Sequence, residues 1–257
     1  MNYSKVAKYI ASWLADYCNI SNLEGFIIGI SGGIDSALTS TLCAQTGKKT
    51  LLVNMPIRQS PAEYSRAQSH IFDLKSKFNN VEEIEIDLTP LFDLLEKTVP
   101  ETTAKNDLSM ANSRARLRMT TLYAIGQANA CLVVGTGNKI EDFGVGFYTK
   151  YGDGGVDISP IADLTKSQVM GLSIEIGIID EIIRAKPTDG LWGDNRSDED
   201  QLGASYPELE WAMAFTGEEI ELNEREKAVL KIYRKFNTIN KHKMEPIPVC
   251  KIPSALN

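Results

Sequence analysis

Cysteine is scarce in this sequence, and no two cysteines form a C-x-x-C pair. The four cysteines are spread along the chain, as Cys18, Cys43, Cys131 and Cys250. Three of them lie in or beside apolar runs, where reduced cysteines usually pack. The pattern favours a reduced protein, and we expect it to be cytoplasmic.

Long apolar runs and an excess of positive charge are also missing. No apolar segment approaches the roughly 18 residues needed to cross a bilayer, and the N-terminus has no basic stretch followed by an apolar one. The net charge is -7 and the isoelectric point is near 5.0. Because affinity for phosphate backbones and anionic lipids grows with the number of Lys and Arg contacts, we expect no nucleic-acid partner and no membrane association. A local basic pocket remains compatible with this charge.

The chain is long enough to bury one sizeable core. It has 257 residues, of which 43% are hydrophobic, and two full domains would leave each with a small core. We therefore expect a single domain over residues 1–257, with a core at about 20–180 and a lid plus a C-terminal helical segment at about 186–257. The polar stretch 186–203, which contains proline, glycine and five acidic residues, is expected to be a mobile lid.

Short apolar runs typical of buried strands alternate with segments of helical spacing. The expected strands are 26–30, 50–54, 83–87 and 131–135, and the expected helices are 6–17, 62–78, 109–129, 165–176 and 224–241. Parallel strands joined by right-handed helical crossovers follow from such alternation. The sequence predicts an α/β fold, a doubly wound parallel sheet flanked by helices, with further helices at the C-terminus.

The segment Ser31-Gly32-Gly33-Ile34-Asp35-Ser36 follows the first expected strand and opens a helix. Glycines let a backbone approach an anion, and a helix N-terminus presents free N–H groups to it, so the segment is typical of a phosphate-binding loop. It lacks the lysine of the G-x-x-x-x-G-K-[ST] loop but has Asp35, whose carboxylate can hold Mg²⁺. This difference indicates cleavage of ATP with pyrophosphate as the leaving group. The alternative is a tight Gly-Gly turn in which Asp35 or Ser36 caps the helix.

The motif S-G-G-x-D-S resembles the signature loop of the N-type ATP pyrophosphatases. Further blocks, in order along nearly the whole chain, resemble ammonia-dependent NAD synthetases. These blocks are 112–119, 135–141, 147–157, 164–166, 186–188 and 242–243. The resemblance implies an adenine-nucleotide α-hydrolase-like fold and a reaction that joins deamido-NAD, ATP and ammonia into NAD, AMP and pyrophosphate. It also implies a homodimer with the dinucleotide site shared across the interface.

The resemblance assigns roles in ATP and metal binding. The implied ATP-binding residues are Gly29, Ile30, Ser31, Gly32, Gly33, Ile34, Asp35, Ser36, Thr136, Lys166 and Thr188. Asp35 and Glu141 would hold Mg²⁺, and Lys166 could replace the lysine that the loop lacks. Without the resemblance, Lys166 reads as an exposed lysine at a helix start, Glu141 as a surface acid, and the two threonines as turn or cap residues.

For the dinucleotide, the resemblance implies Arg116, Lys150, Asp157, His242 and Lys243. Arginines at 114 and 118 would share one helix face, with Arg116 about 200° away, so all three cannot reach one phosphate.

The implied catalytic residues are Asp35, Lys166 and a carboxylate that deprotonates ammonium, for which Asp153 and Asp157 are equal candidates. His70 matches no block and is expected to be an exposed helix residue. Because only about 25 residues precede the first expected strand, we expect no fused glutaminase, and hence free ammonia or a separate donor.

Two other functions share the same ATP loop. One is a tRNA-modifying enzyme of the lysidine synthetase or thiolase type, against which the acidic charge and the missing C-x-x-C weigh. The other is a nucleotide-binding module without catalysis, which would have no need for Asp35, Glu141 and Lys166 together.

Overall fold

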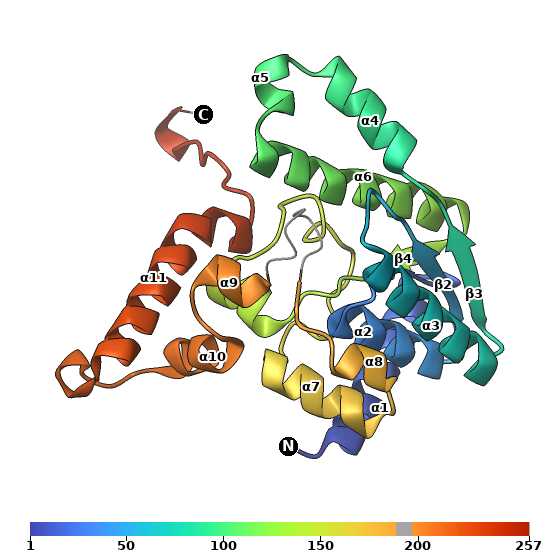
Figure 1. Ribbon diagram of the computed structural model, residues 1–257, viewed down its shortest axis with the longest axis horizontal. Helices are drawn as coiled ribbons and strands as arrows, with labels where there is room; N and C mark the ends of the chain where they lie inside the picture. The colour runs from blue at the N-terminus through green and yellow to red at the C-terminus, as the bar shows by residue number, and fades with distance from the viewer. Residues whose placement is uncertain (189–196, 257) are drawn as a thin grey trace.

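A computed structural model describes residues 1–188 and 197–256, and it contains a parallel sheet flanked by helices, on the side of the molecule opposite α10 and α11 (Figure 1). The strands are β1 (Gly25–Gly29), β2 (Lys49–Asn54), β3 (Val81–Glu85) and β4 (Cys131–Val133), in the spatial order β3-β2-β1-β4. All three strand pairs are parallel, and Val134 extends the sheet by a bridge to Ile158. The four strands expected from the sequence are confirmed, with ends shifted by at most two residues.

Helices cover both faces of the sheet, which confirms the doubly wound arrangement. On one face lie α1 (Tyr3–Ile20), α2 (Ile34–Gln45), α3 (Pro61–Lys77), α7 (Lys166–Glu175) and α8 (Asp180–Ile183); on the other lie α4 (Thr89–Thr98) and α6 (Asp107–Ala128). In β1, Phe26 and Ile28 pack into the first layer and Ile27 into the second. Because successive side chains of a strand point to opposite faces, a run of apolar residues suits a strand buried on both.

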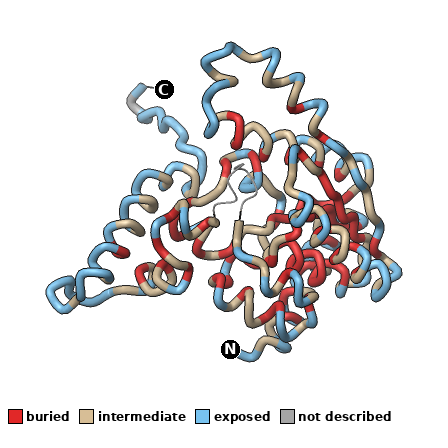
Figure 2. The backbone as a smooth tube through the Cα atoms, in the orientation of Figure 1, coloured by how far each residue is buried: buried red, intermediate tan, exposed pale blue. Residues whose placement is uncertain are grey.

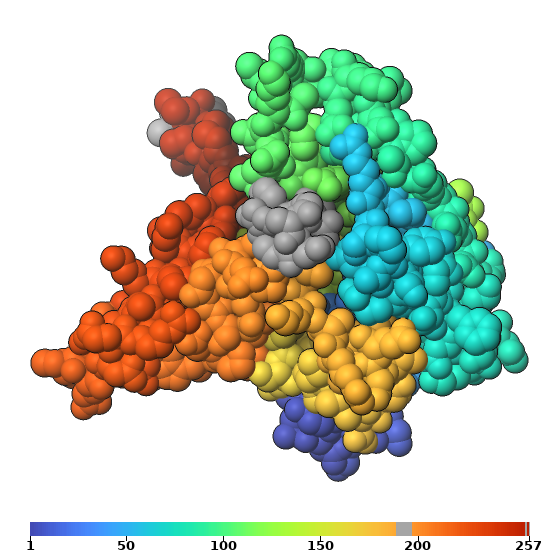
Figure 3. Space-filling view, viewed as in Figure 1, coloured from blue at the N-terminus to red at the C-terminus, as the bar shows by residue number. Residues whose placement is uncertain are grey.

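The C-terminal helices build an apolar cluster of their own. It joins the π-helix η1 (Ile140–Val145), α9 (Asp198–Leu202), α10 (Tyr206–Ala214) and α11 (Glu224–Met244). In Figure 3, α10 and α11, orange to red, lie at one side of the molecule and α3 and α4 at the other. The remaining short helices are α5 (Glu101–Ala104), η2 (Glu219–Glu221) and η3 (Ser254–Leu256). Of the expected lid, residues 189–196 lie outside the described part of the chain, and α9 falls within its second half.

The burial pattern agrees with most expectations from the sequence. Buried residues concentrate in the sheet and the helices packed on it, whereas the C-terminal tail is exposed (Figure 2). Cys18, Cys43 and Cys131 are buried and Cys250 is exposed, and all four are free thiols. Among the described residues, no helix combines the length and apolar character needed to cross a bilayer.

His70 is a correction to the sequence analysis, because it is fully buried rather than exposed. It lies on the face of α3 that packs against α2, where its Nε2 and the Ser40 hydroxyl are 2.9 Å apart. Burial lowers the pKa of His70 to about 4. The apolar residues Ala67, Ile71 and Leu74 recur at helical spacing and mark the buried face of α3. His70 lies on the same face, so this spacing was a signal for its burial.

Candidate active site

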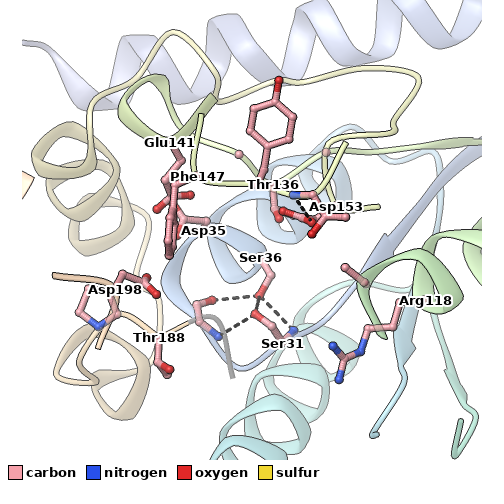
Figure 4. A pocket seen from close by; sticks show the side chains of 18 of the residues that line it. Ser31, Asp35, Ser36, Arg118, Thr136, Glu141, Phe147, Asp153, Thr188 and Asp198 are labelled. Carbon is pink, nitrogen blue, oxygen red and sulfur yellow. Dashed lines mark hydrogen bonds between the residues drawn. The ribbon is translucent and has the colours of Figure 1, made fainter. Parts of the chain in front are cut away.

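A cavity of about 580 Å³ opens beyond the carboxyl ends of β1 and β4. Its walls come from the loop after β1, the first turns of α3, one face of α6, the loop after β4, the start of α7 and the end of α11. Figure 4 shows Ser31, Thr136 and Asp153 among the side chains around it. In open parallel sheets, ligands bind in the crevice at this edge, where helices leave for opposite faces. The position and the size of the cavity suit a nucleotide-sized ligand.

The loop Ser31–Ser36 forms the part of the wall nearest to β1. Gly32 has φ +80°, and a Cβ there would lie 2.5 Å from the carbonyl oxygen of Glu63, so only glycine fits. The hydroxyls of Ser31 and Ser36 are 3.1 Å apart, and the Gly33 N–H donates to Ser31 Oγ at 3.2 Å.

No side chain caps the N-terminus of α2 at Gly33. This excludes the alternative in which Asp35 or Ser36 serves as a helix cap. The free N–H groups and the dipole of α2 therefore face the cavity, which favours an anion there.

Three charged side chains meet at the other side of this loop. Lys166 Nζ donates to Asp35 Oδ2 at 2.6 Å and to Glu141 Oε1 at 3.0 Å. Lys166 is only 8% exposed, which excludes the alternative of an exposed lysine at a helix start. Burial lowers its pKa, but the charges of Asp35 and Glu141 outweigh burial and raise it, so the ammonium stays protonated. Burial also raises the pKa of Asp35, against the opposing effect of Lys166.

Two residues that the sequence analysis missed hold these carboxylates in place. Asn138 donates from Nδ2 to Asp35 Oδ1 at 3.2 Å. The Tyr206 hydroxyl donates to Glu141 Oε1 at 2.5 Å and lies 3.2 Å from Asp198 Oδ2, while Lys166 Nζ is 4.7 Å from the centre of the Tyr206 ring. Asn138 belongs to the block 135–141 and could have been named from it. Tyr206 carries no comparable signal, because Ser205 and Glu208 mark only the start of α10.

Of the three arginines on α6, Arg118 lines the cavity and Arg116 does not. Arg118 Nε donates to the Met55 carbonyl oxygen at 3.0 Å, and burial lowers its pKa to about 10. Arg116 is exposed and donates to the Lys150 carbonyl oxygen at 3.3 Å. Arg114 lies 5.3 Å from the centre of the Phe92 ring. The expected split of the arginines between two helix faces is confirmed.

The two candidate bases have different surroundings. Asp153 lines the cavity and accepts a hydrogen bond from the Thr149 N–H at 3.0 Å. The Asp153 side chain is exposed to the cavity. The protein atoms packed around its carboxyl group desolvate it and raise its pKa to about 6. Asp157 is not among the described residues that line the cavity. Its carboxylate accepts from the Val133 N–H at 2.8 Å and from the Tyr123 hydroxyl at 3.0 Å.

The residues implied for the dinucleotide lie at the rim of the cavity or beyond it. Lys243 lines the cavity and donates to the Tyr148 carbonyl oxygen at 2.7 Å. Lys150 donates to the His242 carbonyl oxygen at 2.6 Å, so that Arg116, Lys150 and His242 form a hydrogen-bonded chain.

The cavity thus collects most of the site residues that the sequence implied. Those in its wall are Gly29, Ile30, Ser31, Gly32, Gly33, Ile34, Asp35, Ser36, Thr136, Glu141, Asp153, Lys166, Thr188 and Lys243.

The family model for NAD synthase matches residues 6–246. The chain belongs to the NAD synthase family. It is 41% identical to the NH(3)-dependent NAD(+) synthetase of Mycoplasmopsis pulmonis over 203 residues, which cover 79% of this chain and 76% of that protein. It is 37% identical to the enzyme of the same name from Mycoplasma genitalium, over 91% of this chain and 92% of that one.

Among solved structures, the NMN synthetase of Francisella tularensis superposes on this NAD synthase-family chain with a TM-score of 0.86. It is 29% identical, and the match covers 99% of both chains. This structural match confirms the adenine-nucleotide α-hydrolase-like fold expected from the resemblance. Neither a tRNA-modifying enzyme nor a non-catalytic module is favoured by the comparisons.

Proposed function

We propose that this chain is a ligase that makes NAD from deamido-NAD, ATP and ammonia and releases AMP and pyrophosphate. The observation that carries the proposal is the cavity that joins an uncapped phosphate loop to the buried Asp35–Lys166–Glu141 cluster. Relatives named NH(3)-dependent NAD(+) synthetase, at 41% and 37% identity, support it.

In the first step, a carboxylate oxygen of the nicotinate group attacks the α-phosphorus of ATP, and pyrophosphate leaves. The carboxylate becomes an acyl adenylate, since oxide itself is too poor a leaving group for amide formation. Negative charge grows on the departing pyrophosphate, and the uncapped N–H groups in the first turn of α2, those of Ile34 and Asp35, are placed to stabilise it. Lys166 contributes a fixed positive charge beside the loop.

In the second step, ammonia attacks the acyl carbon and AMP leaves. Ammonium must lose a proton first, and Asp153 is our candidate for the base. Asp153 lines the cavity, and a pKa of about 6 leaves its carboxylate ionised at neutral pH. This pKa is also closer to the operating pH, where a general base works best. Asp157 is the weaker candidate, because its carboxylate is engaged by Val133 and Tyr123.

The residues present fit the Mg²⁺ ion that the resemblance implies. Asp35 and Glu141 both approach one point, the Lys166 ammonium, and two carboxylates completed by substrate phosphates are a usual donor set for Mg²⁺. Among the described residues, no group of three or more His, Cys, Asp or Glu side chains forms a metal site, so phosphate oxygens and water would supply the other ligands. When bound, the ion would neutralise charge on the phosphates.

We also propose a homodimer in the cytoplasm, with residues 1–257 acting as one unit made of a core at about 20–180 and a lid plus helical segment at about 186–257. Arg116, Lys150 and His242 lie outside the cavity, where a second chain could complete the dinucleotide site. Large apolar side chains are exposed on the C-terminal tail and on α4, including Ile247, Val249 and Leu94. Native mass measurement should then give twice the chain mass of 28.4 kDa.

A second substrate is favoured by one observation, the full-length match to the Francisella NMN synthetase at a TM-score of 0.86. If this chain acted similarly, the acceptor would be the mononucleotide whose nicotinate carboxylate becomes the amide of NMN. The chemistry and the ATP site would be unchanged, and only the length of the acceptor would differ.

The test is a product assay with purified protein, Mg²⁺, ATP, ammonium and either deamido-NAD or nicotinate mononucleotide. We expect AMP and pyrophosphate in equal amounts with NAD, and a higher kcat/KM for the dinucleotide. ADP as the product, or equal turnover without any acceptor, would contradict the proposal. A higher kcat/KM for the mononucleotide would decide for the second substrate.

A further inference from the structure

A cation on α3 lies directly against the phosphate loop. Arg66 lines the cavity, and its Nε donates to the Gly32 carbonyl oxygen at 3.2 Å. The backbones of α3 and the loop also approach each other closely. A Cβ on Gly32 would lie 3.3 Å from the Arg66 Cβ and 3.1 Å from the Ala67 nitrogen. The position of Arg66 relative to the loop is therefore fixed by helix packing.

Most of the hydrogen-bonding capacity of this guanidinium is unused within the part of the chain that the structure describes. A guanidinium carries five N–H donors in one plane, and among the described residues the bond from Nε to Gly32 is the one hydrogen bond that Arg66 makes. The side chain is half-buried. The neighbouring Glu63 carboxylate accepts a hydrogen bond from the Ser60 hydroxyl at 2.9 Å. The two Nη groups of Arg66 are thus available to a ligand in the cavity.

Three other buried or half-buried cations of the cavity wall also donate to protein groups. Lys166 is held by two carboxylates, Arg118 donates to Met55 and Lys243 donates to Tyr148. The loop itself contains no lysine. Among these cations, Arg66 is the one whose guanidinium hydrogen-bonds a loop carbonyl oxygen through Nε while its two Nη groups remain open to the cavity.

We propose that Arg66 binds the β- and γ-phosphates of ATP and stabilises the pyrophosphate that leaves. The planar fork of a guanidinium can donate two parallel hydrogen bonds to phosphate oxygens, and Nε held by Gly32 fixes its plane in advance. Arg66 thus supplies from a neighbouring helix the charge that a lysine supplies within other phosphate loops. This inference rests on the proposed function, in which the triphosphate occupies the loop Ser31–Ser36.

The test is to compare Arg66→Gln with the wild-type enzyme in the binding of ATP, pyrophosphate and AMP. Glutamine can still donate to the Gly32 carbonyl oxygen but carries no charge, so the packing of α3 on the loop is kept. Dissociation constants are measured by calorimetry with Mg²⁺ and without acceptor, so that no turnover occurs. Lys75→Gln is the matched control, since it removes the same charge from α3 at an ion pair with Glu83 on β3.

We expect Arg66→Gln to weaken ATP and pyrophosphate binding by the same factor, about 10- to 100-fold, as for the loss of charged hydrogen bonds. AMP binding should not change, and Lys75→Gln should change none of the three. Unchanged ATP and pyrophosphate affinity, or an equal loss for AMP, would overturn the role of Arg66. Failure of the wild-type enzyme to form AMP and pyrophosphate would instead overturn the proposed function. Thermal unfolding of Arg66→Gln guards against misfolding, and Arg66→Lys should recover part of the affinity.

Discussion

Lys166, Asp35 and Glu141 form a buried ionic cluster whose members depend on one another. Taking a carboxylate out of water costs several kcal/mol, and the cost is recovered only with close partners. Lys166 provides such a partner to both acids at 2.6 and 3.0 Å. Charges held in this way contribute little net stability, so their presence indicates a role in chemistry.

Replacing Asp35 with Asn should lower turnover far more than stability. Lys166 would keep Glu141 as a partner, and asparagine is nearly isosteric, so we expect a change of only a few degrees in Tm. Because a carboxylate at the phosphate loop would be lost, kcat should fall about 100-fold or more. Steady-state kinetics and thermal unfolding of the same preparation provide the check. Full activity in this variant would exclude Asp35 from the chemistry.

The two steps of the reaction can separate Asp153 from Asp157. If Asp153 deprotonates ammonium, Asp153→Asn should slow NAD formation by about 100- to 10,000-fold. It should leave the exchange of labelled pyrophosphate into ATP intact, because that exchange needs only the first step. For Asp157→Asn, we expect mainly a loss of stability through the Val133 and Tyr123 contacts. The reverse pattern would make Asp157 the base.

Buried His70 should make the protein less stable in mild acid. Its pKa falls from 6.5 to about 4 on folding, so the unfolded chain binds a proton more readily. The stability contributed by neutral His70 is present above pH 6.5 and is lost as the pH falls towards 4, by up to about 3 kcal/mol. Urea unfolding across this range should show the slope in the wild type. His70→Gln should flatten it, and an unchanged slope would assign the effect to other groups.

Residues of the site differ in how far the sequence reveals them. Gly32, Asp35 and Ser36 belong to one short motif after a strand. Binding a phosphate restricts the residue types that such a loop accepts, so the motif can be recognised in the sequence. Tyr206 and Arg66 reach the site only because α10 and α3 pack beside it. Their roles follow from tertiary contacts, which no local spacing encodes.

At the scale of elements, α10 connects the C-terminal helices to the chemistry through one side chain. The Tyr206 hydroxyl holds Glu141, which belongs to the π-helix η1. Tyr206 also belongs to the apolar cluster of α10 and α11. Packing of these helices and the placement of Glu141 are therefore coupled.

Tyr206→Phe should keep the apolar packing and release Glu141. Partners that orient a metal ligand typically contribute 10- to 100-fold in metal affinity. If Glu141 holds Mg²⁺ as proposed, the Mg²⁺ concentration for half-maximal activity should rise about tenfold or more. Tyr233→Phe is the control, because Tyr233 packs near Gly144 of η1 without touching the carboxylates. An equal effect of both substitutions would reduce Tyr206 to a packing residue.

Elements were predictable where their pattern is long and regular. The strands and α3, α6, α7 and α11 were expected within about three residues of their ends, because buried runs and helical stripes are local signals. The helices α4 and α10 were not expected from the sequence. Half of the residues of α4 are exposed, and Phe92 is its one buried residue. The apolar side chains of α10 pack against α11 and η1. The π-helix η1 also depends on tertiary contacts, since Asn237 and Asn240 of α11 bind the Gly144 and Val145 carbonyl oxygens at 2.8 Å.

At the scale of the whole molecule, three of the four thiols are sealed in the interior and one lies on the tail. Burial raises the pKa of Cys18, Cys43 and Cys131, in the last case to about 11, so the reactive thiolate is suppressed as well as shielded. A maleimide dye should therefore attach once per folded chain, at Cys250. Resonance energy transfer between such dyes could then report whether two tails come together when subunits associate, without any engineered mutation.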